Sequence, residues 1–133
     1  MSKDSIFSKI IRREIPANIV YEDSNHIAFL DIGPFSKGHT LIVPKKVYEN
    51  ITDMPENEYL ELQKVVLKLV KHYREMFKCK IGTLIYGLDV MHVHVHIFPL
   101  NDDIEIFNFS RRKKYLKNEA ENYVKMLNLG GQN

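Results

Sequence analysis

The chain of 133 residues has little of several features that would narrow its function at once. Cys79 is the single cysteine, so the chain can form no internal disulfide and cannot build a cysteine-rich zinc site. No run approaches the about 18 uninterrupted apolar residues of a membrane-spanning helix. The N-terminus also lacks the apolar segment of a signal peptide. We therefore expect a protein of the reducing cytoplasm with no membrane partner.

The chain also has no large excess of charge of one sign, because 19 basic and 17 acidic residues leave a net charge of +2. Nucleic-acid binding depends on a strongly basic surface, so no nucleic-acid partner is expected. With 44% apolar and 27% charged residues, the composition is that of an ordinary globular domain. The chain has no Gly-, Ser- or Pro-rich linker and no internal repeat, so we expect one domain with a sizeable core.

The spacing of apolar residues predicts an α+β fold with a five-stranded sheet, one long helix, a short N-terminal helix and a C-terminal helical tail. Strands joined by short turns pair antiparallel, so the sheet should be mainly antiparallel. The predicted strands cover residues 18–22, 26–31, 39–43, 81–86 and 91–98. The predicted helices cover residues 5–13, a long segment ending near residue 78, and a segment with Ala120, Tyr123, Val124 and Leu127 on one apolar stripe.

Polar residues predict where these elements begin. Asp4 or Ser5 would cap the first helix, and Asp53 with Glu56 has the capping-box pattern ahead of the long helix. The last helix would be capped by the pair Asn118 and Glu121. Residues 87–90 would form a tight connection between the last two strands.

Three histidines alternate with aliphatic residues in the last predicted strand: His92, His94 and His96. Alternate residues of a strand share a face at about 6–7 Å spacing, so the imidazoles would line one surface while the aliphatic residues face the core. One histidine would be interpreted as a satisfied structural residue, whereas three in alternation favour a functional array. The array could hold zinc, copper or nickel, or one neutral imidazole could act as a nucleophile while its neighbours bind an anion.

The segment His92-Val93-His94-Val95-His96-Ile97-Phe98 resembles the signature of the histidine triad (HIT) family of nucleotide hydrolases and transferases, and is closest to its nucleotide-binding branch. The likeness runs from Ser5 to Pro99. It implies a HIT domain over residues 4–107, followed by a C-terminal extension over residues 108–133, and a homodimer. Further segments that resemble the family, in order, are Ile6–Ile11, Glu14–Ala17, Val20–Asp23, Ala28–Ile32 and Gly38–Lys46.

The resemblance also implies a role for each site residue. His94 would attack the α-phosphorus of a nucleoside phosphoramidate or a related nucleotidyl substrate, and water would release a nucleoside monophosphate from the nucleotidyl-histidine. His96 and His39 would donate to phosphate oxygens, His92 would order the strand, and Asp31 would accept the ribose hydroxyls. No cofactor and no metal is implied. The apolar slot for a purine base would comprise Ile6, Phe7, Ile10, Phe29 and Ile32.

Several of these residues also have ordinary structural explanations. On periodicity alone, Ile6, Phe7 and Ile10 fit a core as well as a binding slot. Asp31 could simply begin a turn, and His39 could be a capped strand end.

Two positions depart from the family pattern. Many bacterial members carry Cys-x-x-Cys where this chain has Ser5 and Ser8, and hydroxyls are poor zinc ligands, so we expect no structural zinc. The family's longer Gly-Gln-Ser/Thr-Val loop is shortened here to residues 87–90, which places Leu88 and Asp89 near the substrate. A carboxylate at Asp89 would repel anionic leaving groups and predicts a preference for phosphoramidates and lysyl-type adenylates over dinucleoside polyphosphates. The alternatives are a dinucleoside polyphosphate hydrolase and a nucleotide-binding or scaffolding protein with weak catalysis.

Overall fold

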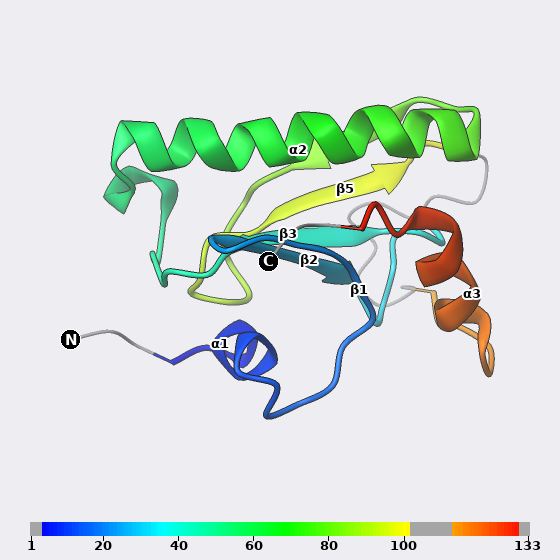
Figure 1. Cartoon of the computed structure of the whole chain (residues 1–133), viewed down its shortest axis with the longest axis horizontal. Coiled ribbons are helices and arrows are strands. Elements are labelled where there is room, and N and C mark those ends of the chain that lie inside the picture. The colour runs from blue at the N-terminus through cyan, green and yellow to red at the C-terminus, as the bar shows by residue number, and fades with distance from the viewer. Residues whose placement is uncertain (1–3, 102–112, 131–133) are drawn as a thin grey trace.

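The computed structural model describes residues 4–101 and 113–130, and these residues form a five-stranded sheet with helices packed on it (Figure 1). The strand order is β1-β2-β3-β5-β4, and every neighbouring pair is antiparallel, so the predicted α+β class and antiparallel sheet are confirmed. The elements are α1 (Ile6–Ile11), β1 (Ile19–Glu22), β2 (His26–Leu30), β3 (Thr40–Pro44), a 3-10 helix (Ile51–Asp53), α2 (Glu56–Phe77), β4 (Ile81–Leu84), β5 (Val95–Pro99) and α3 (Glu119–Leu127).

One face of the sheet is covered by α2, which runs along its length in Figure 1. Leu62, Leu69 and Tyr73 of α2 are fully buried, and they share one cluster with Ile42 of β3 and Val95 of β5. The aliphatic residues between the triad histidines therefore face this core, as the alternation predicts.

The opposite face of the sheet is covered by α1. Phe7 and Ile10 pack against Ile27 and Phe29 of β2 and against Leu41 of β3. Because both faces are covered, every residue of β2 and of β3 is buried. The short N-terminal helix thus lies on the same side of the sheet as the triad histidines, and this packing brings the site together.

The last two strands are shorter than predicted. β4 ends at Leu84 instead of residue 86, and β5 begins at Val95 instead of residue 91. The connection consequently spans residues 85–94 and contains His92 and His94, so only His96 lies within the strand itself. In this segment the His92 backbone oxygen lies 2.7 Å from His94 Nδ1 and the Val93 N–H donates to the Tyr48 oxygen, contacts that alternation of residue types cannot reveal.

Two of the predicted caps are wrong. Asp53 belongs to the 3-10 helix, which Asn50 caps, and α2 begins after Pro55 with no side-chain cap. Asn118 precedes α3 in a left-handed conformation and its side chain makes no cap hydrogen bond. Ser5 does cap α1, which is shorter than predicted, through a reciprocal capping box with Ser8.

The C-terminal segment packs against the sheet end and α2. Leu127 of α3 is fully buried, and the other members of the predicted stripe contact the same core, so the stripe is confirmed. The predicted domain boundary at residues 107 and 108 lies outside the described residues. Within residues 4–101 and 113–130, no helix is long and apolar enough to span a bilayer.

Candidate active site

A cavity of about 290 Å³ lies between α1, the ends of β2 and β3, and the residues preceding β5. It brings together most of the predicted site residues, whereas His39 and His92 lie behind its wall. Its lining is mainly apolar with a few polar groups, as is typical of a site for a small organic ligand. The predicted residues that line it are Ile6, Phe7, Ile10, Phe29, Asp31, Ile32, Asp89, His94 and His96.

His94 presents a nitrogen lone pair to this cavity. Its Nδ1 lies 2.7 Å from the backbone oxygen of His92. A carbonyl oxygen can only accept, so Nδ1 carries the proton and Nε2 of the neutral ring is unprotonated. Phe7 packs edge-on against the ring with centroids 5.0 Å apart and holds it in place. His94 is 2% exposed and lines the pocket, so its ring lies in a largely dry environment.

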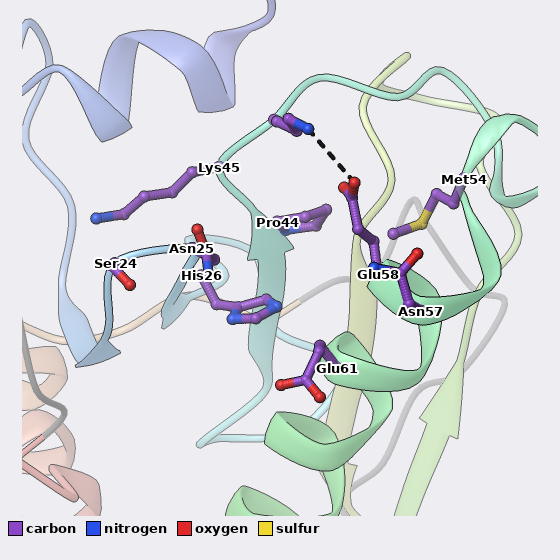
Figure 2. A pocket seen from close by; sticks show the side chains of 10 residues that line it. Ser24, Asn25, His26, Pro44, Lys45, Met54, Asn57, Glu58 and Glu61 are labelled. Carbon is purple, nitrogen blue, oxygen red and sulfur yellow. Dashed lines mark hydrogen bonds and ion pairs between the residues drawn. The ribbon is translucent and has the colours of Figure 1, made fainter.

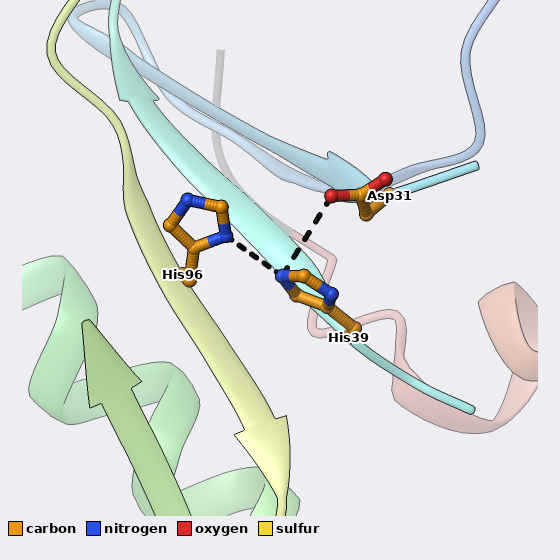
Figure 3. Close-up of side chains that lie close together, drawn as sticks. All are labelled: Asp31, His39 and His96. Atoms are coloured by element: carbon orange, nitrogen blue, oxygen red, sulfur yellow. Dashed lines mark hydrogen bonds and ion pairs between the residues drawn. The ribbon is translucent and has the colours of Figure 1, made fainter. Parts of the chain in front are cut away.

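His39 and His96 form a hydrogen-bonded pair beside Asp31 (Figure 3). The backbone N–H of Phe35 donates to His39 Nδ1 at 3.0 Å, so the proton of the neutral His39 ring is on Nε2. His39 Nε2 lies 2.8 Å from His96 Nδ1, which must then accept and leave the proton of His96 on Nε2. The Phe35 ring stacks on His39 with centroids 4.4 Å apart and fixes the ring plane.

His39 lies behind the cavity wall. The side chain is fully buried, does not line the cavity, and bonds inside the protein through both ring nitrogens. Its Nε2 faces His96 Nδ1 and not the cavity. His96 lines the cavity and offers the Nε2–H donor.

His92 lies behind the cavity wall and bonds to two other parts of the fold. Its Nε2 lies 2.8 Å from the backbone oxygen of Pro44, so this nitrogen donates and Nδ1 accepts the Ser5 hydroxyl proton at 2.7 Å. Burial lowers the pKa of His92, which favours the neutral form that these two bonds require. The ring thereby ties α1 to the end of β3, while its backbone oxygen orients His94.

Asp31 combines a turn with the predicted site. Its Oδ1 accepts from the Gly33 backbone N–H at 2.9 Å, and its Oδ2 lies 3.7 Å from His39 Nε2. Because an ionised carboxylate has about four acceptor positions, capacity remains for ribose hydroxyls. Both the turn and the binding interpretation of Asp31 therefore fit its geometry, since the side chain also lines the cavity.

The shortened loop brings Asp89 close to the nucleophile. Asp89 Oδ1 lies 3.4 Å from His94 Nε2, and the Tyr86 hydroxyl donates to Oδ2 at 3.3 Å. The Tyr86 ring also stacks on His96, with centroids 5.1 Å apart and an interplanar angle of 14°. Sequence reasoning missed Tyr86 and Phe35, because neither belongs to a pattern of spacing and both reach the histidines only through tertiary packing.

Asp31, His39 and His96 form the one cluster in the described part of the chain that places three metal-binding atoms within 4.8 Å of one another. The hydrogen bonds do not suit a metal there. His39 Nδ1 accepts a backbone proton, so its Nε2 is protonated and has no lone pair for a metal. Two nitrogens on one tetrahedral zinc would also be about 3.3 Å apart, farther than the observed 2.8 Å.

Another cavity, of about 480 Å³, lies between the β1–β2 turn and the start of α2 (Figure 2). His26 and Glu61 line it, as do Lys46 and Glu58, which form an ion pair at 3.3 Å. Asp23 already engages His26 Nδ1 at 3.0 Å. None of the histidines of the triad lines this cavity, so we assign the chemistry to the smaller one.

Comparisons with known proteins found matches over most of the chain. The family model of the HIT domain matches residues 12–103. A HIT-like protein of Methanocaldococcus jannaschii is 40% identical over 90% of this chain and 98% of its own length. The purine nucleoside phosphoramidase of Escherichia coli is 33% identical over 73% of this chain and 87% of its own length. The crystal structure of a HIT-like protein from Bartonella henselae superposes with a TM-score of 0.82 at 33% identity and covers 94% of each chain.

Proposed function

Because the chain belongs to the HIT family, we propose that it is a hydrolase that cleaves nucleoside 5′-phosphoramidates or related nucleotidyl substrates at the α-phosphorus. The observation that carries this proposal is the unprotonated Nε2 of His94, which faces the cavity while Nδ1–H is held by a backbone carbonyl. A neutral imidazole in this tautomer is a competent nucleophile near pH 7. The relative from Escherichia coli, a purine nucleoside phosphoramidase, supports the same reaction class.

In the first step, the lone pair of His94 Nε2 forms a bond to the α-phosphorus as the bond to the leaving group breaks. The electron pair of the broken bond goes to the leaving group, and a departing amine takes up a proton from solvent, which the later hydrolysis step returns when the attacking water loses a proton. The His94 ring becomes positively charged, and the His92 carbonyl stabilises it through the Nδ1–H bond. Water then attacks the nucleotidyl-histidine and releases the nucleoside monophosphate, which restores neutral His94.

Two neighbouring groups suit the rest of the substrate. The Nε2–H of His96 would donate to a nonbridging phosphate oxygen, where charge develops during transfer. Asp31 would accept both ribose hydroxyls, and the apolar wall of Phe7, Ile10 and Phe29 would hold a planar base. The nucleotide would thus lie with its base towards α1 and its phosphate towards the histidines.

The test is turnover of a fluorogenic adenosine phosphoramidate by the wild type and by His94→Asn. His94→Asn should lower kcat by at least about 10³-fold while leaving the affinity for AMP nearly unchanged, because the base and ribose contacts remain. Acid quenching should trap a nucleotidyl adduct on the wild type alone. His72→Asn, on the half-exposed side of α2, is the matched control and should keep full activity. Retention of more than about a tenth of the activity in His94→Asn, a loss below ~1.4 kcal/mol, contradicts the covalent mechanism.

We also propose that two copies of the chain pair through β4 and the adjoining side of α2. β4 is an edge strand, so one side of its backbone has no neighbouring strand in the described sheet. Leu60 and Leu67 of α2 are 50% and 54% exposed and lie seven residues apart, on one stripe of the helix. Lys71, one turn beyond Leu67, lines a groove with Ile81 of β4, so the apolar stripe and the open edge adjoin.

A further inference from the structure

The loop between β2 and β3 supplies the proton donor that sets the state of the histidine pair. Within residues 34–38, the Phe35 N–H donates to His39 Nδ1 at 3.0 Å, and the His39 N–H donates back to the Ser36 oxygen at 2.9 Å. The buried Ser36 hydroxyl donates to the Pro99 oxygen at 2.7 Å and anchors the middle of the loop to β5. The tautomer of His39, and through it that of His96, therefore depends on where this loop is held.

The two ends of the loop are held by the C-terminal segment, which follows the region matched by the HIT model at residues 12–103. This segment makes a backbone hydrogen bond, a side-chain hydrogen bond and an ion pair to the loop. The contacts are Lys113 N–H to the Pro34 oxygen at 3.1 Å, Gly38 N–H to the Tyr115 hydroxyl oxygen at 2.9 Å, and Lys37 Nζ to Glu119 Oε1 at 2.7 Å.

The charge states of Tyr115 and Glu119 favour the hydrogen bond and the ion pair that hold the loop. Burial raises the pKa of Tyr115 to about 12, so the hydroxyl stays neutral and its oxygen accepts from Gly38. The hydrogen bond from Lys37 lowers the pKa of Glu119, so the carboxylate stays ionised opposite the ammonium group. The Lys37 ammonium also lies 5.7 Å from the centre of the Tyr115 ring, which adds a cation–π contact.

The backbone at Gly38 makes the loop sensitive to this attachment. Gly38 has φ of 101°, and a Cβ there would lie 2.3 Å from the Phe77 ring of α2. The loop is therefore packed against α2 on one side and bonded to Tyr115 on the other. Loss of the Tyr115 hydroxyl leaves the Gly38 N–H without this acceptor. Of the two contacts at Gly38, only the packing against α2 then remains.

We propose that residues 113–119 act as a positioning clamp, which holds the 34–38 loop so that Phe35 keeps the proton of His39 on Nε2 and thereby makes His96 a donor towards the phosphate. The last step rests on the proposed function, whereas the effect on the tautomers does not. When the loop moves away, the Phe35 N–H no longer donates to His39 Nδ1, and the opposite tautomers of both rings become accessible. In that arrangement His96 Nε2 is an acceptor and repels phosphate oxygens instead of stabilising them.

The first test measures the ring ¹⁵N chemical shifts of His39 and His96 by NMR, in the full-length wild type and in Tyr115→Phe. This substitution removes only the hydroxyl and keeps the ring. The wild type should show an unprotonated Nδ1 and a protonated Nε2 for both histidines, and Tyr115→Phe should show a mixture of tautomers. Tyr59→Phe, which deletes a hydroxyl that accepts from Gln63 on α2, is the matched control and should leave the shifts unchanged.

The second test measures kcat and KM for a nucleoside phosphoramidate. Since complete loss of an oxyanion donor costs about 10²–10³-fold in kcat, partial loss of the correct tautomer should lower kcat by about three- to tenfold in Tyr115→Phe, with KM unchanged. Glu119→Gln, which weakens the pair with Lys37, should act in the same direction. Unchanged ring shifts in both variants overturn the clamp, whatever the activity. If the tautomers shift in the variants but the wild type turns over no nucleotide, the clamp is supported and the proposed function is refuted.

Discussion

Replacement of Asp89 by Asn tests how the shortened loop selects the leaving group. The Asp89 carboxylate lies 3.4 Å from the nucleophilic nitrogen of His94. A substrate phosphorus must approach that nitrogen to about 3–3.5 Å, so the leaving group departs within a short distance of the carboxylate. Neutralising this charge should favour an anionic leaving group and disfavour a cationic one. Asp89→Asn keeps the size and shape of the side chain, removes the charge and replaces one acceptor oxygen by an NH2 group.

The magnitude follows from distance and exposure. Two unit charges about 5 Å apart interact by about 0.8 kcal/mol in water and by about 3 kcal/mol at an effective dielectric constant of 20. The Asp89 side chain is 47% exposed, so solvent screening brings the value near the lower limit, at about 1 kcal/mol. Because the two leaving groups carry opposite charge, the two effects add to about 2 kcal/mol in the ratio. Asp89→Asn should therefore raise kcat/KM for a dinucleoside polyphosphate about 30-fold relative to kcat/KM for an amine phosphoramidate.

The comparison of two substrates isolates this effect. Asp89 also faces the His94 ring, and its influence on that ring is common to both substrates, so it cancels in the ratio. Glu121→Gln removes one exposed carboxylate on α3 and controls for net charge. The ratio should move towards its wild-type value at high salt, because screening weakens the charge effect. Equal changes for both substrates, or the same shift in Glu121→Gln, would refute the reasoning.

Two further predictions concern stability and assembly. Burial lowers the pKa of His92 in the folded protein, so the unfolded state binds more protons as pH falls below about 6.5, and the free energy of unfolding should decline there. Urea denaturation between pH 7.5 and 5.5 should show a shallower decline for His92→Asn, and parallel slopes would contradict this assignment. Leu67→Asp should convert a dimer to a monomer in light scattering, whereas Glu121→Gln should not. A wild-type monomer at micromolar concentration would reject the proposed pairing.

Periodicity and turn chemistry alone predicted the α+β class, the antiparallel sheet and the long helix, because these depend on local patterns of apolar residues. These local patterns did not predict where several helices and strands begin and end. The residue types of Asp53 and Glu56 match a capping box, yet Asp53 belongs to a separate 3-10 helix, where it forms a capping box with Asn50. The alternation around His94 extends the expected strand to residue 91, although the chain leaves the ladder before Val95.

The sequence by itself identified the triad from residue type and spacing, and Asp31 from the resemblance to the HIT family. Only the tertiary structure showed how each of these side chains is hydrogen-bonded. The proton position on His92 depends on the backbone oxygen of Pro44, 48 residues away in sequence, whereas His39 and His94 bond to Phe35 and His92, four and two residues away, in the loop conformations that the fold imposes. A hydrogen bond between residues far apart in sequence exists only once the chain has packed. The same physical reason applies to Tyr115, whose contact with Gly38 joins residues 77 positions apart in sequence.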